Sequence, residues 1–199
     1  MRAEKKAPRV NRAHFAGRWY PGDPRRLSAA LERYLSQVEK RSRAVAAAIL
    51  PHAGLTFSGL GMADGFANVE ARQTEQVVIL APSHYRALRP DTLHVEDFDA
   101  HETPLGPIKG NPDFWLPHGF EGRPRTGQVI QLANDAVEVE HAVELFFPYV
   151  RHLLGEAVRL SLALVPELTG RREIDRLADT LIDRIEANAG SRGTLLIVS

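Results

Sequence analysis

Short apolar runs alternate along the chain with segments in which apolar residues have helical spacing. Each run has the length of a strand, and its continuous apolar character predicts burial on both faces. Between the runs, apolar residues recur every three or four positions, which gives a helix one buried face. The expected strands are 45–50, 76–81, 158–165 and 194–198, and the expected helices begin near Pro24 and Ser58 and span 139–154 and 171–188. This order predicts an α/β protein with a central, mostly parallel sheet flanked by helices.

Other parts of the chain have less regular patterns. Residues 92–110 indicate one or two short strands around a TPLG turn, and residues 111–136, rich in Pro, Gly and polar side chains, are expected to form a long irregular excursion. Pro148 removes one backbone hydrogen bond and should kink or delimit the helix predicted around it. Residues 1–13 are expected to form a basic tail, and residues 14–199 a single domain.

The composition excludes several classes of function. With 199 residues, 44% of them hydrophobic, the chain can bury one sizeable core. Its 25 Lys and Arg residues balance 25 Asp and Glu residues, so no net field attracts the molecule to nucleic acid or to an anionic membrane. No apolar run approaches the roughly 20 residues that span a bilayer. The sequence has no cysteine, which excludes disulfides and thiolate ligands and favours a cytoplasmic protein.

Two histidines occupy equivalent positions in successive strand-to-helix junctions. His52 follows the run that ends in ILP, and His84 follows the run that ends in LAPS. Their separation, 84 − 52 = 32 residues, matches one β-α-β unit, so parallel strands would bring both imidazoles to the carboxyl edge of the sheet. We therefore predict a metal site with His52 and His84 as ligands. The alternative is a pair of ordinary loop histidines with structural hydrogen bonds.

The segment EVEHAVE at 138–144 contains a second group of candidate residues. Glu140 and Glu144 are four residues apart and share a helix face, with His141 three residues before Glu144. A carboxylate beside an imidazole orients the ring, which suits acid/base catalysis or support of a metal ligand. His141 and Glu144 are therefore candidate catalytic residues. The alternative is a solvated helix start whose acidic residues complement the helix dipole.

The segments AGRWYPGD, PHAGLTFSG, APSHY, ETPLG and EVEHAVELFFPYV, in this order and spacing, resemble the Memo family, the protein B component of the AmmeMemoRadiSam group. The resemblance runs from about Ala16 to the end of the sequence. It implies a fold similar to that of the class III extradiol (LigB-type) dioxygenases, with a metal-capable cleft. By this resemblance, His52 and His84 would bind iron or copper, and Trp19 would lie near the cleft.

The sequence also departs from the family pattern. Phe57 stands where family members usually have tyrosine, so it would keep an aromatic ring in the cleft without the phenol. Family members continue beyond a strand like TLLIVS with a Ser-Ser-Asp-x-x-His motif and a later ligand. The third family ligand is thus absent from these 199 residues, and the fold is expected to be truncated relative to the family. The spacing does not select among Glu140, Glu144 and Asp64 as its replacement. We expect a homo- or hetero-oligomer to cover the missing region.

Different classes of function remain open. In the first, the chain is a metal-dependent redox or dioxygenase-like enzyme that acts on a small molecule. In the second, the same cleft binds a peptide or phosphopeptide without catalysis, with Arg18 and the two histidines recognising an anionic group and Trp19 stacking on the ligand. The resemblance supports this alternative, because Memo proteins have been described as adaptors for phosphorylated peptides. A remnant that has kept the fold and lost the site is the third.

Overall fold

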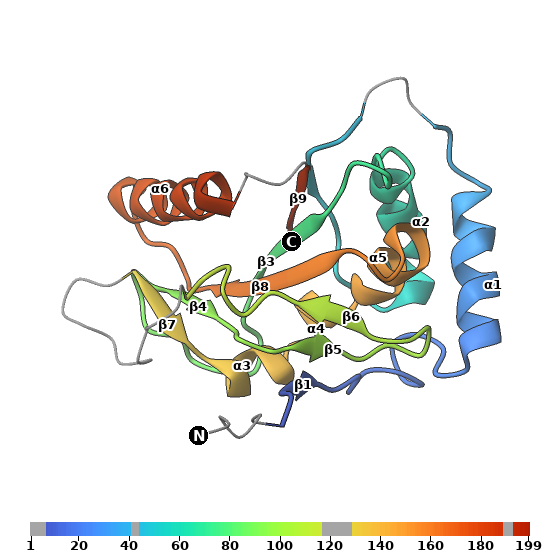
Figure 1. The fold of residues 1–199 in the computed structure, drawn as a ribbon, viewed down its shortest axis with the longest axis horizontal. Helices are drawn as coiled ribbons and strands as arrows, with labels where there is room; N and C mark the ends of the chain where they lie inside the picture. The colour runs from blue at the N-terminus through green and yellow to red at the C-terminus, as the bar shows by residue number, and fades with distance from the viewer. Residues whose placement is uncertain (1–6, 41–43, 117–128, 189–192) are drawn as a thin grey trace, which may run out of the picture.

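A computed structural model describes residues 7–40, 44–116, 129–188 and 193–199 and shows a central sheet with helices on both faces (Figure 1). In this part of the chain, a nine-stranded sheet has the order β1-β5-β6-β8-β3-β9-β2, with β4 paired to β8 and β7 paired to β4. The strands are β1 Val10–Asn11, β2 Ala47–Ile49, β3 Gln76–Pro82, β4 Leu93–Val95, β5 Ala100–His101, β6 Ile108–Gly110, β7 Ile130–Leu132, β8 Arg159–Val165 and β9 Thr194–Val198. The helices are α1 Pro24–Leu35, α2 Leu55–Phe66, α3 Asn134–Glu138, α4 His141–Glu144, α5 Phe147–Leu154 and α6 Arg171–Asn188.

The predicted α/β architecture with a mostly parallel sheet is confirmed. Strands β2, β9, β3, β8 and β6 run parallel to their neighbours in this order. Antiparallel pairing occurs between β5 and β6 and between β4 and β8. Because β2, β9 and β3 are parallel, their carboxyl ends share one edge of the sheet, which is the edge where open α/β sheets usually bind ligands.

Each face of the sheet is covered by its own group of helices. On β3, Val77 and Ile79 belong to the core that includes α1, α2 and α5, whereas Val78 and Leu80 belong to the core that includes Leu177 of α6. Successive side chains of a strand point to opposite faces, so a strand covered on both sides is apolar throughout. Figure 1 shows α6 apart from the group formed by α1, α2 and α5.

Local sequence explains where the first helix begins. The Asp23 carboxylate accepts a hydrogen bond from the backbone N–H of Arg26 at 2.8 Å, and Pro24 occupies the first turn. Both are typical of helix starts, because the first N–H groups of a helix have no intrahelical acceptor. Leu27 and Leu31 then point into the core and are fully buried. Residues of α1 line the same cavity as Trp19, so this helix lies beside the turn that carries Trp19.

The structure differs from the sequence prediction in three segments. The prediction of an irregular segment at 111–136 is wrong at the end of that segment, where β7 pairs with β4 and α3 begins at Asn134. Residues 117–128 of the segment lie outside the described residues. The helix predicted at 139–154 is two helices, α4 and α5, because Pro148 cannot donate a backbone hydrogen bond and instead fits the first turn of α5. Finally, Val10 and Asn11 of the predicted tail form β1, which pairs with β5.

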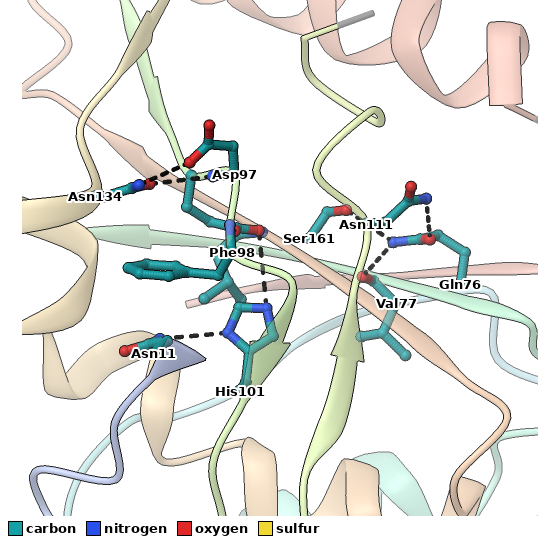
Figure 2. A network of polar contacts seen from close by, with 11 residues as sticks. Asn11, Gln76, Val77, Asp97, Phe98, His101, Asn111, Asn134 and Ser161 are labelled. Atoms are coloured by element: carbon teal, nitrogen blue, oxygen red, sulfur yellow. Dashed lines mark hydrogen bonds and ion pairs between the residues drawn. The ribbon is translucent and has the colours of Figure 1, made fainter. Parts of the chain in front are cut away.

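A buried polar network lies within the sheet (Figure 2). His101 on β5 is fully buried; its Nδ1 lies 3.3 Å from the Asn11 amide and its Nε2 lies 3.9 Å from Glu96, which is also fully buried. The Gln76 amide donates to Val77 O and Ser161 Oγ at 2.9 and 3.1 Å. These contacts join β1 to β5 and β3 to β8. Among the described residues, no helix has the length and apolarity needed to cross a bilayer.

Candidate metal centre

His52 and His84 lie together at the carboxyl edge of the sheet, as their spacing predicts. His52 follows β2 and His84 follows β3, and β9 lies between these two strands. The centroids of the two imidazole rings are 5.1 Å apart, with the rings edge to face. Parallel strands end at the same edge, so backbone topology alone brings the two rings near each other.

A third imidazole, that of His141, completes the cluster. His141 is the first residue of α4, which packs against β3, and its side chain is almost fully buried. Its ring centroid lies 4.5 Å from that of His84 and 5.7 Å from that of His52. One ligand atom from each of the three histidines lies within 4.8 Å of the others, and no other set of three potential ligands occurs in the described ranges. The sequence predicts His141 as an acid/base residue or a support for a metal ligand, and not as a ligand itself. Its place directly after Glu140 in EVEHAVE is the only sequence signal that bears on its position.

Glu140 links two of these histidines. Its buried carboxylate accepts hydrogen bonds from the His84 backbone N–H at 2.5 Å, from His84 Nδ1 at 2.9 Å and from the Ala142 N–H at 3.0 Å, which caps α4. The same carboxylate lies 3.0 Å from His141 Nδ1. Glu140 therefore orients the histidine rings, and it is not among the ligand atoms that converge in the cluster.

The remaining histidine has its own hydrogen-bond partner. The Ser199 hydroxyl donates to the Leu50 carbonyl at 2.5 Å, so its oxygen accepts a hydrogen bond from His52 Nδ1 at 2.6 Å. A neutral imidazole that carries its proton on Nδ1 has a free lone pair on Nε2. His52 and His84, whose Nδ1 atoms both donate away from the cluster, therefore each have Nε2 available to a ligand.

Burial favours the neutral form of two of these histidines, His52 and His141. Desolvation, and secondly the neighbouring His84, lower the pKa of His52, and Glu140 acts in the opposite direction. Desolvation also lowers the pKa of His141; Glu140 opposes this change, whereas His84 and His52 reinforce it. A pKa below the ordinary value leaves both rings uncharged at neutral pH. An uncharged imidazole is the form that binds a metal ion.

Aromatic side chains form a wall beside His141. The Trp19 ring lies 4.4 Å from the His141 ring, and the rings of Tyr85 and Phe15 lie 5.5 and 5.8 Å from it. Phe15 also packs edge to face against Trp19 at 5.8 Å. These contacts place Trp19 next to the histidine cluster and restrict the access of water to His141.

The other predicted site residues lie in different surroundings. Glu144 accepts hydrogen bonds from the N–H groups of His14 and Phe15, both at 2.9 Å, and from the Tyr20 hydroxyl at 2.6 Å. Phe57 projects from the first turn of α2 and is 87% exposed. Arg18 is exposed and lines a cavity together with Trp19. Catalytic roles for His141 and Glu144 and cleft roles for Phe57 and Arg18 stay predictions.

The donor set fits a transition metal ion. Three imidazoles converge, and the Glu140 carboxylate lies behind two of them, close to the Nδ1 atoms of His84 and His141. Imidazole nitrogen suits copper, iron and zinc, and a carboxylate behind the ligands raises their basicity.

The fold and the cluster thus define an α/β protein with a candidate three-histidine metal centre at the carboxyl edge of its sheet. Residues 11–199 match the family model described as Memo-like protein, and the chain belongs to the Memo family. It is 33% identical over 162 residues to Protein MEMO1 of Xenopus tropicalis, which is 79% of this chain and 50% of that protein. Human Protein MEMO1 is 30% identical to this chain, again over 79% of this chain and 50% of that protein. Protein memo-1 homolog of Caenorhabditis elegans is 30% identical over 79% of this chain and 42% of that protein. The chain spans about half the length of the curated relatives it matches.

Proposed function

We propose that this chain binds a transition metal ion, iron or copper, through His52, His84 and His141, for redox or oxygenase-like chemistry on a small molecule. The observation that carries the proposal is the convergence of three imidazole ligand atoms within 4.8 Å. If His52 and His84 were ordinary loop histidines and His141 belonged to a solvated helix start, nothing would require these three residues from distant parts of the chain to meet. The proposal assigns His141 to the metal, in place of the acid/base role that the sequence indicates.

Surrounding residues would prepare the ligands before the ion arrives. Glu140 holds His84 through a hydrogen bond at 2.9 Å and places a negative charge beside the ion. Ser199 fixes the tautomer of His52, so that no rearrangement is needed on binding. A redox-active ion held in this way would exchange electrons with a bound small molecule.

The aromatic wall would supply the other half of the site. Trp19 and Tyr85 lie against His141, and planar rings of this kind provide a dry surface for an organic ligand. Exclusion of water strengthens electrostatic interactions inside a site and protects reactive groups from hydrolysis. These residues would therefore orient the substrate and limit solvent access.

Elemental analysis of purified protein tests the proposal directly. The protein should be handled anaerobically, reconstituted separately with iron, copper and zinc, and freed of weakly bound ions. Near-stoichiometric iron or copper is expected for the wild type, and a loss of at least about tenfold in affinity is expected for His52→Ala, His84→Ala and His141→Ala, because each removes one of three donors.

His152→Ala is the matched control, because His152 lies on α5, away from the cluster, and its replacement should leave the metal content unchanged. Circular dichroism would establish that each variant keeps its fold. Absence of metal from the wild type after all three reconstitutions would overturn the proposal. Selective retention of zinc would support the site and refute the redox function.

A further inference from the structure

A cavity of about 320 Å³ lies between the Gly17–Gly22 turn and the helices α1 and α2. Three arginines line it: Arg18 from the turn, and Arg26 and Arg33 from α1. The other lining residues are apolar, aromatic or uncharged, so the described wall of this cavity contains three positive charges and no negative one. A volume of this size accepts a small molecule or one group of a larger one.

The three arginines are not paired with carboxylates in the part of the chain that the structure describes. Within the described ranges, no ion pair joins Arg18, Arg26 or Arg33 to a carboxylate, whereas Arg171 on α6 pairs with Asp175 at 2.7 Å. The whole chain has no net charge, so this concentration of positive charge is a local feature. Clustered guanidinium groups repel one another, and an anion bound between them would relieve that repulsion.

The backbone adds to the same field. Leu55 and Thr56, in the first turn of the 12-residue helix α2, also line the cavity; the Leu55 N–H donates to the Trp19 carbonyl at 2.9 Å, so the helix contributes its partial charge and not a free Leu55 donor. The residue that caps this helix, Gly54, provides no side-chain hydrogen bond. A helix N-terminus carries a partial positive charge, which complements an anion.

One of the arginines, exposed Arg33, contacts a packed aromatic ring. The Arg33 guanidinium lies 5.1 Å from the centre of the Tyr34 ring, in a cation–π arrangement. Tyr34 in turn lies directly against α2 at Gly59, where a Cβ atom would come within 2.6 Å of the ring. Glycine leaves room for this ring, so Tyr34 packs between the two helices and presents its face to Arg33.

We propose that this cavity binds the phosphate group of a small molecule. A phosphate monoester presents three terminal oxygens and close to two negative charges, which match three planar guanidinium donors and a helix end. A carboxylate has two oxygens and one charge and would leave part of this donor set unsatisfied. Binding requires no metal ion, because none of the three histidines lines the cavity.

Trp19 provides a means to observe this binding. It lines the cavity, and its ring also lies 4.4 Å from the His141 ring. The chain has two tryptophans, and the second, Trp115, is buried in the other core. The Trp115→Phe variant therefore makes Trp19 the sole fluorescent indole, next to both sites.

The test is a titration of chelator-treated protein with inorganic phosphate, glycerol phosphate and acetate at constant ionic strength, followed by calorimetry and by Trp19 fluorescence. Saturable binding of phosphate and glycerol phosphate, and not of acetate, is expected. Arg26→Gln/Arg33→Gln should weaken it by about tenfold or more, since each charged hydrogen bond contributes on this scale. Arg25→Gln is the matched control. Arg25 lies on the same helix and is exposed like Arg26 and Arg33, but it does not line the cavity, so the affinity of this variant for phosphate should change by less than about twofold.

Further variants separate this proposal from the metal centre. Arg18→Gln, in the turn, should also weaken phosphate binding, which gives a second readout independent of α1. The His52→Ala/His84→Ala variant should bind phosphate normally, and the Arg26→Gln/Arg33→Gln variant should bind metal normally. The proposal is overturned if phosphate does not bind, or if Arg25→Gln weakens binding as much as Arg26→Gln/Arg33→Gln. It is also overturned if only the His52→Ala/His84→Ala variant loses phosphate binding.

Discussion

At the scale of residues, Glu140 and Glu144 show how two similar side chains acquire different tasks. The Glu140 carboxylate contacts His84 and His141, whereas the Glu144 carboxylate receives the backbone N–H groups of residues 14 and 15 and the Tyr20 hydroxyl. Burial raises the pKa of Glu144, and its three hydrogen bonds lower it in part. One carboxylate therefore orients candidate metal ligands, and the other fastens the segment that carries the aromatic wall.

Glu140→Gln and Glu144→Gln should consequently have different effects. Glu140→Gln removes the charge behind two histidines, and metal affinity should fall by about 10- to 100-fold. Glu144→Gln should leave metal affinity within about threefold and lower the free energy of unfolding by about 1–3 kcal/mol, because a buried hydrogen-bond network loses an acceptor. Metal titrations and urea unfolding of both variants measure these quantities. Equal losses of metal affinity would contradict this division.

Residue-level chemistry was only partly predictable from the sequence. His52 and His84 follow apolar runs, so their meeting could be inferred from strand direction alone. The ring of His141 joins them because α4 is a separate short helix that begins at that residue. Ser199 reaches His52 because β9 lies between β2 and β3. These contacts depend on strand order and helix orientation, which local periodicity does not determine.

At the scale of elements, predictions succeeded where the pattern is local and continuous. The helix α6 and the strands β3, β8 and β9 follow their apolar patterns closely, because each has enough residues to show a period. The three-residue β7 has polar Gln131 at its centre and exists only through its pairing with the distant β4. A strand this short carries almost no local signal, so its existence depends on tertiary contacts.

Contacts between helices offer a direct test at this scale. Tyr149 on α5 is fully buried, stacks on Phe66 of α2 at 5.2 Å, and donates its hydroxyl hydrogen to the Gly59 carbonyl at 2.7 Å. Tyr149→Phe keeps the ring and removes this bond, so it should cost about 1 kcal/mol of unfolding free energy. Tyr149→Ala also removes the ring and should cost about 3–5 kcal/mol. Urea unfolding measures both values, and equal costs would show that the hydroxyl, not the packed ring, holds α5 to α2.

At the scale of the whole molecule, the sheet encloses an ionisable pair that most cores avoid. Glu96 and His101 are both fully buried, with Glu96 Oε1 3.9 Å from His101 Nε2. Glu96 also accepts hydrogen bonds from the backbone N–H groups of Phe98 and Leu162, at 2.6 and 3.1 Å. Because the pair ties β5 and the segment after β4 to β8, its protonation affects the stability of the whole fold.

Burial raises the pKa of Glu96 to about 8 and lowers the pKa of His101 to about 3. Between its ordinary value of 4.5 and about 8, folded Glu96 keeps a proton that the unfolded chain has released, so stability falls as pH rises through this window. For His101 the unfolded chain holds the extra proton between about pH 3 and 6.5, so stability rises with pH there. The two effects oppose each other only below pH 6.5, which leaves Glu96 as the member of this pair that titrates from there to about 8.

Urea unfolding of the wild type and of Glu96→Gln, from about pH 6.5 to 8.5, isolates this contribution. The wild type should lose stability relative to the variant by up to about 1.4 kcal/mol per pH unit, the limit for one proton, and the difference should level off above about pH 8. Other titrating groups are common to both proteins and cancel in the comparison. Glu75→Gln, at an exposed position, should give a curve parallel to that of the wild type. If the Glu96→Gln curve is also parallel, Glu96 is ionised in the folded protein, and its two backbone hydrogen bonds outweigh its desolvation.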